Sequence, residues 1–245
     1  MINNSFNSTL DSKKARVEQT KSLIDLTLLD ESASIEQLDD QRNKANLNKV
    51  AAICVYPKHL GSFSMLSHIN RATVVNFPSG MTPLALTLVE LDAIEKEGIA
   101  NEIDYVFPYP LYLNNEEEKA FDCLMQVQQK CLTAKFKLKV IIETGAFTDL
   151  MQIYNLSLKL AEIDVDFIKT STGKHEKGAS FEASLAILEA IKNSKKSCGI
   201  KISGGVREPE DAFKYIELAE KTLEKPADKT WFRLGASSLL DSLSE

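Results

Sequence analysis

Long apolar runs are missing from this sequence of 245 residues, and so is any excess of basic charge. No stretch approaches the roughly 18 consecutive apolar residues that a membrane-spanning helix needs. Residues 1–14 are polar and rich in Asn and Ser, without the apolar core of a secretory signal. The formal charge is −6, whereas nucleic-acid binding requires a basic face that neutralises phosphates. We therefore expect no membrane insertion, no nucleic-acid partner and a cytoplasmic location.

Cysteine and histidine are also scarce. The four cysteines lie far apart and form no C-x-x-C pair, which indicates reduced thiols. The three histidines form neither an H-x-H nor an H-E-x-x-H pattern. Carboxylates could still bind Mg²⁺, but no pattern points to it, so we predict no metal site and no cofactor.

Short apolar runs rich in β-branched residues recur along the chain, separated by polar stretches of helical character. The eight runs cover residues 22–28, 51–56, 72–77, 102–107, 138–142, 166–170, 199–203 and 231–235. Strands that alternate with helices form βαβ units and a parallel sheet. Eight units in 245 residues leave about 31 residues for each, the size of one strand and one helix in a (β/α)8 barrel.

The sequence thus predicts an α/β fold, a single-domain (β/α)8 TIM barrel over residues 1–245. Residues 1–20 are interpreted as a leading polar segment with an extra N-terminal helix. An open doubly wound sheet is the alternative, although no G-x-G-x-x-G follows any of the runs. In two intervening segments, apolar residues recur at the spacing of a helix face. They are Leu84, Leu88, Leu91 and Ile94 in the first, and Leu185, Leu188 and Ile191 in the second.

Charged residues interrupt several of the apolar runs. These residues are Asp25, Asp104, Lys139, Lys169 and Lys201. A charge in a strand that is covered on both faces is costly unless it is paired. In an eight-stranded barrel, the inward side chains converge on one axis, and the active site lies at the carboxyl ends of the strands. We therefore expect Asp104, Lys169 and Lys201 to meet although they are far apart in sequence.

Two lysines on neighbouring strands suggest imine chemistry. An ordinary lysine has a pKa of about 10.4 and is mostly charged near pH 7, whereas only the neutral amine attacks a carbonyl carbon. Burial and a second ammonium both lower such a pKa. Lys169 and Lys201 could supply that arrangement, with Asp104 moving protons. The alternatives are a solvated strand end for Lys169, a structural ion pair with Asp104 or Glu143 for Lys139, and a turn cap for Asp25.

Three segments rich in glycine and hydroxyl residues follow strands. They are residues 170–174, 203–207 and 235–238. Small residues let backbone N–H groups approach phosphate oxygens, and hydroxyls add donors. Barrel enzymes often bind phosphate with the loops after strands seven and eight, where the last two segments lie. Ordinary strand-to-helix turns are the alternative, but the adjacency of the two segments favours an anion site.

Several motifs resemble one known family. The most specific are DFIKTSTG at 166–173 and KISGGVR at 201–207. The others are AICVYP at 52–57, VNFP at 75–78 with Gly80, KVIIET at 139–144, and RLGASS at 233–238. Together they resemble the deoxyribose-phosphate aldolases over nearly the whole chain. The resemblance implies a class I lyase that reversibly cleaves 2-deoxy-D-ribose 5-phosphate to D-glyceraldehyde 3-phosphate and acetaldehyde, without metal.

The same resemblance implies a role for each charged strand residue. Lys169 would form the Schiff base, and Lys201 would be the second ammonium that lowers the pKa of the nucleophile and relays protons. Asp104 would donate and accept protons, with Asp25 and Lys139 in support. Phosphate would be held by Gly173, Gly204, Gly205, Ser237 and Ser238, with Lys174 nearby, and Cys54 and Thr170 would line the substrate pocket.

Some questions stay open at this point. Many members of the resembled subgroup end in a tail with a terminal Tyr, whereas this chain ends at Glu245 without one. Another class I aldolase or transaldolase acting on a different sugar phosphate is the nearest alternative, followed by a sugar-phosphate binder with impaired catalysis. The expected partners are a small sugar phosphate and an aldehyde, and we expect a homo-oligomer, with a dimer favoured.

Overall fold

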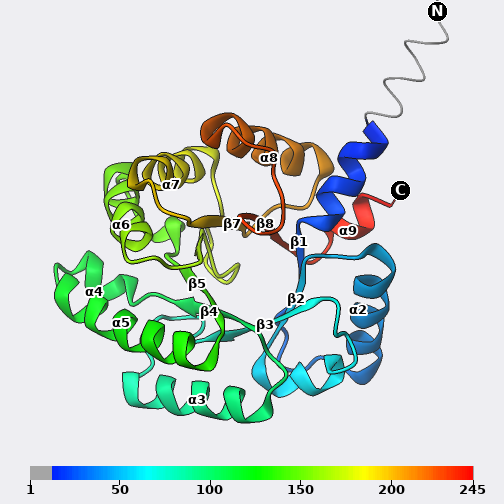
Figure 1. Ribbon diagram of the computed structural model, residues 1–245, viewed down its shortest axis with the longest axis horizontal. Helices are drawn as coiled ribbons and strands as arrows, with labels where there is room; N and C mark the ends of the chain where they lie inside the picture. Colours follow the sequence, from blue (N-terminus) through cyan, green and yellow to red (C-terminus); the bar gives the residue numbers. More distant parts are fainter. Residues whose placement is uncertain (1–12, 245) are drawn as a thin grey trace, which may run out of the picture.

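The computed structural model describes residues 13–244, and its centre is a closed barrel of eight parallel strands (Figure 1). Each strand pairs with the next in sequence, and β8 pairs with β1 to close the barrel. The strands are β1 Ile24–Leu28, β2 Ala52–Val55, β3 Asn70–Val75, β4 Glu102–Val106, β5 Lys137–Ile141, β6 Phe167–Lys169, β7 Gly199–Ser203 and β8 Phe232–Ala236. The predicted TIM barrel is therefore confirmed, and every predicted strand lies within about two residues of an observed one.

Helices surround the barrel. They are α2 Ile35–Asn48, α3 Leu84–Glu97, α4 Tyr109–Leu113, α5 Glu117–Ala134, α6 Leu150–Glu162, α7 Phe181–Ser194, α8 Pro209–Leu223 and α9 Leu239–Ser242. Between β2 and β3 the connection is a 3-10 segment, η1 Pro57–Phe63, and a second one, η2 Thr144–Ala146, follows β5. A helix over 13–22 precedes β1, as expected, whereas residues 1–12 of the predicted leading segment lie outside the described residues.

Local signals explain where several helices begin. At the start of α2, the Ser34 backbone N–H donates to the Gln37 side chain at 2.8 Å, and the Gln37 N–H donates back to the Ser34 hydroxyl. This reciprocal capping satisfies two of the N–H groups that lack a partner at a helix start. Asp149 and Ser180 cap α6 and α7 more simply, because each side chain accepts one backbone N–H, from Met151 and Ala183 respectively.

The predicted apolar face of α7 is only partly right. Leu188 and Ile191 are buried, but Leu185 is 40% exposed. The buried face of α7 also contains Ala183 and Ile187, and α7 lies against both α6 and α8. Because successive helical residues are separated by about 100°, Leu185 lies outside this face. In α3, Leu91 and Ile94 are buried and Leu84 and Leu88 pack against the core, as predicted.

Alternation along the strands divides the core from the barrel interior. In β4, Ile103 belongs to the large apolar core beneath the helices, whereas Glu102 and Asp104 lie on the opposite face of the strand. On the β2–β3 side, the residues Cys54, Ala72 and Val74 form a separate small apolar cluster. The interior of the barrel is therefore charged in part, and that part positions the site.

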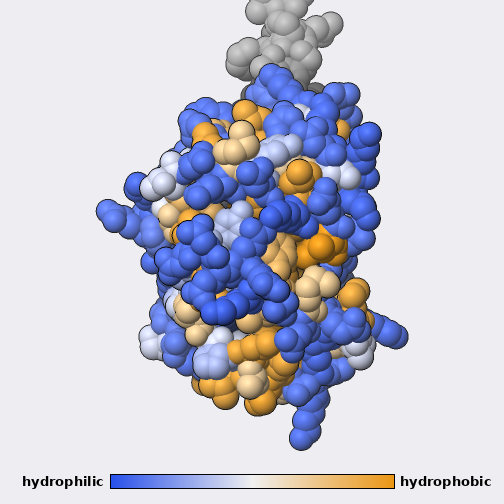
Figure 2. Space-filling model, turned by 90° about the vertical axis from the view of Figure 1, so that its left-hand side faces the viewer, coloured by the Kyte–Doolittle hydropathy of each residue, from blue (hydrophilic) through white to orange (hydrophobic). Residues whose placement is uncertain are grey.

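The outer surface carries scattered apolar side chains. Figure 2 shows a largely hydrophilic face with apolar groups toward the end where α3 lies. Exposed apolar residues of this region include Leu86 and Val89 of α3 and Leu132 of α5. Among the described residues, no helix has the length and apolar character needed to cross a membrane.

Candidate active site

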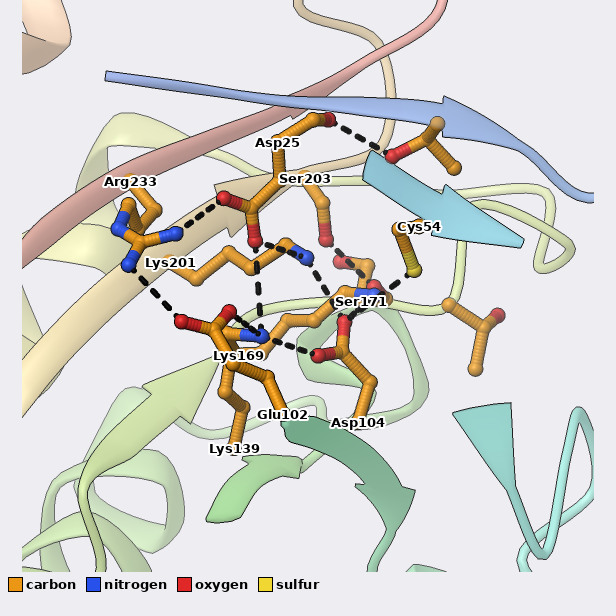
Figure 3. A network of polar contacts seen from close by, with 12 residues as sticks. Asp25, Cys54, Glu102, Asp104, Lys139, Lys169, Ser171, Lys201, Ser203 and Arg233 are labelled. Atoms are coloured by element: carbon orange, nitrogen blue, oxygen red, sulfur yellow. Dashed lines mark hydrogen bonds and ion pairs between the residues drawn. The ribbon is translucent and has the colours of Figure 1, made fainter. Parts of the chain in front are cut away.

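Six strands project charged side chains into the barrel, where they form one network (Figure 3). None of these side chains is more than 2% exposed. Parallel pairing brings them together, because Asp104 lies opposite Lys139, and Lys201 lies opposite both Lys169 and Arg233. The network consists of Asp25 (β1), Glu102 and Asp104 (β4), Lys139 (β5), Lys169 (β6), Lys201 (β7) and Arg233 (β8).

Asp104 accepts hydrogen bonds from three ammonium groups. Lys139 donates to Oδ1 at 2.8 Å, whereas Lys169 and Lys201 both donate to Oδ2 at 2.8 Å. Burial by itself would raise the pKa of Asp104, but the three ammonium charges lower it well below its usual value. Asp104 is therefore a carboxylate at neutral pH, and it connects the two lysines that the sequence predicted to meet.

Arg233 holds the other two carboxylates. Its Nη1 donates to Asp25 Oδ1 at 2.6 Å, and its Nη2 donates to Glu102 Oε1 at 3.1 Å. The second oxygen of each carboxylate contacts a lysine, because Lys201 lies 2.6 Å from Asp25 Oδ2 and Lys139 lies 2.6 Å from Glu102 Oε2. Each carboxylate therefore joins the guanidinium to one lysine across the barrel.

The carboxylates keep Lys201 protonated. Burial would lower the pKa of Lys201, but the charges of Asp104 and Asp25 raise it well above its usual value. The pKa of Lys139 is also raised, since Asp104 and Glu102 outweigh its burial. Both lysines are permanent cations near neutral pH, so neither is suited to act as a nucleophilic amine.

A cavity of about 290 Å³ opens at the carboxyl ends of β6, β7 and β8. Of the seven network residues, Lys169 is the one that lines it. The remaining wall comes largely from loops after strands, including the segments rich in glycine and hydroxyl residues. The predicted phosphate ligands in this wall are Gly173, Lys174, Gly204, Gly205 and Ser237, and Thr172 and Arg207 lie there too. Ser238 is exposed beside them at the start of α9.

Glycine is required by the backbone in this wall. Gly204 and Gly205 have φ values of 87° and 94°, in the region that other residues rarely adopt. A Cβ on Gly178 would lie 2.2 Å from the Gly204 carbonyl oxygen, so the two loops could not approach each other with a side chain there. Consecutive residues of positive φ, next to a strand end, can present N–H groups to an anion.

Comparison with known proteins agrees with this geometry. A family model described as DeoC/LacD family aldolase matches residues 18–245. The chain belongs to this family. A deoxyribose-phosphate aldolase of Agrobacterium fabrum is 40% identical over 233 residues, which cover 91% of this chain and 88% of that relative.

Solved structures of similar proteins share the fold. A deoxyribose-phosphate aldolase from Aeropyrum pernix, described as having a unique tetrameric structure, superposes with a TM-score of 0.77 at 25% identity, covering 96% of this chain and 95% of that one. A Coccidioides immitis protein, provisionally assigned as a deoxyribose-phosphate aldolase, gives a TM-score of 0.81 at 25% identity, covering 99% and 96%.

Two predicted pocket residues of this DeoC/LacD family member lie behind the cavity wall. Cys54 is fully buried, and its thiol contacts Asp104 Oδ2 at 3.8 Å. Burial, together with Asp104, raises the pKa of the thiol, so Cys54 remains uncharged. Thr170 joins β6 to β7, since its hydroxyl donates to the Ser203 carbonyl at 3.0 Å and accepts from the Ser203 N–H. Neither side chain lines the cavity itself.

Lys174 reaches across the mouth of the cavity. Its Nζ donates to the Leu29 carbonyl at 2.8 Å, which links the loop after β6 to the loop after β1. Beneath it, the carboxylate of Glu143 accepts from the backbone N–H and the hydroxyl of Thr172. Burial raises the pKa of Glu143. These contacts fix the loop that carries Gly173 and Lys174.

Sequence reasoning did not single out Glu102 and Arg233, although both belong to the network. Glu102 stands two residues before Asp104, and residues two apart in a strand share a face. An inward Asp104 therefore implies an inward Glu102. Arg233 is a charge between Phe232 and Leu234 in an apolar run, which is the signal that identified Lys201.

Metal binding has little support among the described residues. No group of three or more His, Cys, Asp or Glu side chains in residues 13–244 is arranged to hold a metal ion. The carboxylate oxygens of Asp25, Glu102 and Asp104 are already directed at cationic side chains.

Proposed function

We propose that this chain is a deoxyribose-phosphate aldolase that cleaves 2-deoxy-D-ribose 5-phosphate to D-glyceraldehyde 3-phosphate and acetaldehyde through a Schiff base on Lys169. The observation that carries the proposal is the position of Lys169, which belongs to the charged network and also lines the glycine-rich cavity. The 40% identical relative that bears this name supports the choice of substrate.

In this reaction the neutral amine of Lys169 attacks the aldehyde carbon of the open-chain sugar, and loss of water gives a protonated imine. The C3 hydroxyl then gives up its proton while the C2–C3 bond breaks. The electron pair of the C2–C3 bond moves into the imine to form an enamine, and C3 becomes the aldehyde carbon of glyceraldehyde 3-phosphate. Protonation of C2 and hydrolysis of the imine release acetaldehyde and restore the amine.

Proton transfer is assigned to Asp104, together with Lys201 and water. The Oδ2 atom of Asp104 lies 2.8 Å from both Nζ atoms, within the distance at which a general acid or base works. Asp25 and Lys139 support this arrangement, because they orient Lys201 and the second oxygen of Asp104.

The phosphate of the sugar would lie against the loops after β6, β7 and β8. Backbone N–H groups at Gly173, Gly204 and Gly205 are the proposed donors, and Lys174 is a nearby cation. The hydroxyls of Ser237 and Ser238 would add further donors. An anion bound here would share the cavity with Lys169, so the sugar carbons would lie toward the network.

Imine trapping tests the proposal. The protein is incubated with acetaldehyde and cyanoborohydride, and the modified peptide is identified by mass spectrometry. We expect the mass of an ethyl group on the peptide that holds Lys169, and no such mass in Lys169→Met. A label on Lys201 or Lys139, or no label, would refute the assignment.

Substrate profiling separates the remaining possibilities. The proposal requires acetaldehyde as the donor, and cleavage of 2-deoxyribose 5-phosphate with a lower KM than 2-deoxyribose. Preference for dihydroxyacetone phosphate would indicate another class I aldolase or a transaldolase. Binding of the sugar phosphate without turnover would indicate a binder with impaired catalysis.

The proposal extends to the oligomeric state, the cellular location and the domain organisation of the protein. We infer a homo-oligomer, with a dimer favoured, and exposed apolar residues such as Leu86 and Val89 support association. We also infer a cytoplasmic location and a single domain over residues 1–245. The pairing of β8 with β1 supports the single domain, because both ends of the chain contribute to one barrel.

A further inference from the structure

Six of the seven network residues form a closed ring of alternating charge. Arg233 contacts Asp25 and Glu102, Asp25 contacts Lys201, and Glu102 contacts Lys139. Lys201 and Lys139 then meet on the two oxygens of Asp104, at 2.8 Å each. All six contacts lie between 2.6 and 3.1 Å, and both oxygens of each carboxylate take part.

The ring is electrically neutral, and Lys169 lies outside it. Three cations, Arg233, Lys139 and Lys201, balance the carboxylates of Asp25, Glu102 and Asp104. Lys169 contacts only one of these carboxylates, through Asp104 Oδ2, and it shares that oxygen with Lys201. A charged Lys169 would therefore be a fourth cation beside three carboxylates.

We infer that Arg233 and Glu102 are positioning residues that close this neutral ring, and that the ring sets the pH at which the Lys169 amine reacts. The inference rests on the proposed Schiff-base function and assigns a role to two residues that lie beneath the cavity. Arg233 acts from below the reacting amine, because its guanidinium fixes the carboxylates whose other oxygens face Lys201 and Lys139.

On the cavity side of Lys169, the charged residues of the same wall are Asp30, Lys174 and Arg207. Strand β2 contributes Cys54, whose thiol is uncharged, and the β3 residues of the interior cluster are Ala72 and Val74. Glu143, after β5, also interacts electrostatically with Lys169, but its carboxyl accepts from Thr172 and its pKa is raised by burial. The charges that surround Lys169 from β1, β4, β5, β7 and β8 are those of the ring.

The inference predicts pH shifts of opposite sign. Arg233→Met leaves the ring with one net negative charge, which favours a proton on Lys169 and moves imine formation to higher pH. Glu102→Gln leaves one net positive charge and moves it to lower pH. Each shift is about one pH unit for charges within roughly 10 Å in the protein interior. The double variant is neutral again, so its profile returns toward that of the unmodified protein.

The readout is the pH at which trapping of acetaldehyde by cyanoborohydride on the Lys169 peptide reaches half of its maximum. This readout does not require the phosphorylated substrate. Arg233→Lys keeps the charge and should shift the profile far less than Arg233→Met. Matched controls are Lys192→Met and Glu224→Gln, which remove the charges of an ion pair with substantially exposed side chains and should shift nothing.

The outcomes distinguish a failure of the proposed function from a failure of the inference about the ring. If the unmodified protein shows no label on Lys169, the proposed function is wrong. If it is labelled but the two single variants shift the profile in the same direction, or not at all, the ring has no electrostatic role. If Arg233→Met does not fold, Glu102→Gln and Arg233→Lys still test the electrostatic role of the ring. Only a charge effect lowers the midpoint pH of labelling in Glu102→Gln and leaves the midpoint of Arg233→Lys near that of the unmodified protein.

Discussion

Removing the ammonium of Lys201 should move imine formation to higher pH. Lys169 and Lys201 each lie 2.8 Å from the same oxygen of Asp104, so their Nζ atoms are at most twice that distance apart, about 5.6 Å. Two unit charges at this separation repel by about 3 kcal/mol at an effective dielectric constant near 20, which corresponds to about two pH units. Lys201→Met removes this repulsion and keeps much of the side-chain volume.

The assay is trapping of acetaldehyde on Lys169 as a function of pH. We expect the midpoint of labelling to rise by one to two pH units in Lys201→Met, with a large loss of labelling near pH 7. Relaxation of Asp25 and entry of water would reduce the shift below the full figure. Lys201→Arg, which keeps the charge, is the matched control. A slower reaction with an unchanged midpoint would refute the electrostatic argument, since it would indicate a role in geometry alone.

Two further predictions concern stability. Leu188→Ala should lower the free energy of unfolding in urea by about 2–5 kcal/mol, whereas Leu185→Ala should cost less than about 1 kcal/mol, and equal losses would contradict the observed face of α7. The pKa values of Asp25 and Asp104 are lowered on folding, so their contribution is present above about pH 4 and is lost as pH falls further. Stability measured by denaturant should therefore decline below pH 4, and less steeply in Asp25→Asn.

The strands could be predicted because their apolar character is continuous. The run at 199–203 coincides with β7, and the run at 102–107 exceeds β4 by one residue. The connection after β2 differs from the regular pattern. Pro57 fixes its own φ and begins a 3-10 segment there. No helical spacing in the sequence predicted this segment.

The site was predictable where a charge interrupts an apolar run, as Asp104, Lys169 and Lys201 do. Whether another charged residue joins this site depends on how deep it lies in the barrel, as well as on the face of the strand that carries it. Lys137 and Lys139 share a face of β5, yet Lys137 is exposed at the strand start and Lys139 is fully buried. That depth is set by the stagger of neighbouring strands, which is a property of the closed barrel.

The ring also has a consequence for assembly of the chain. Asp25 and Arg233 are 208 residues apart, on the first and last strands. The first six strands alone carry the three carboxylates of the ring but only one of its cations, Lys139, and the other two, Lys201 and Arg233, arrive with β7 and β8. A partly synthesised barrel would thus enclose unbalanced charge. Docking of the last two strands makes the charge of the ring neutral. A stable closed barrel therefore requires the complete chain.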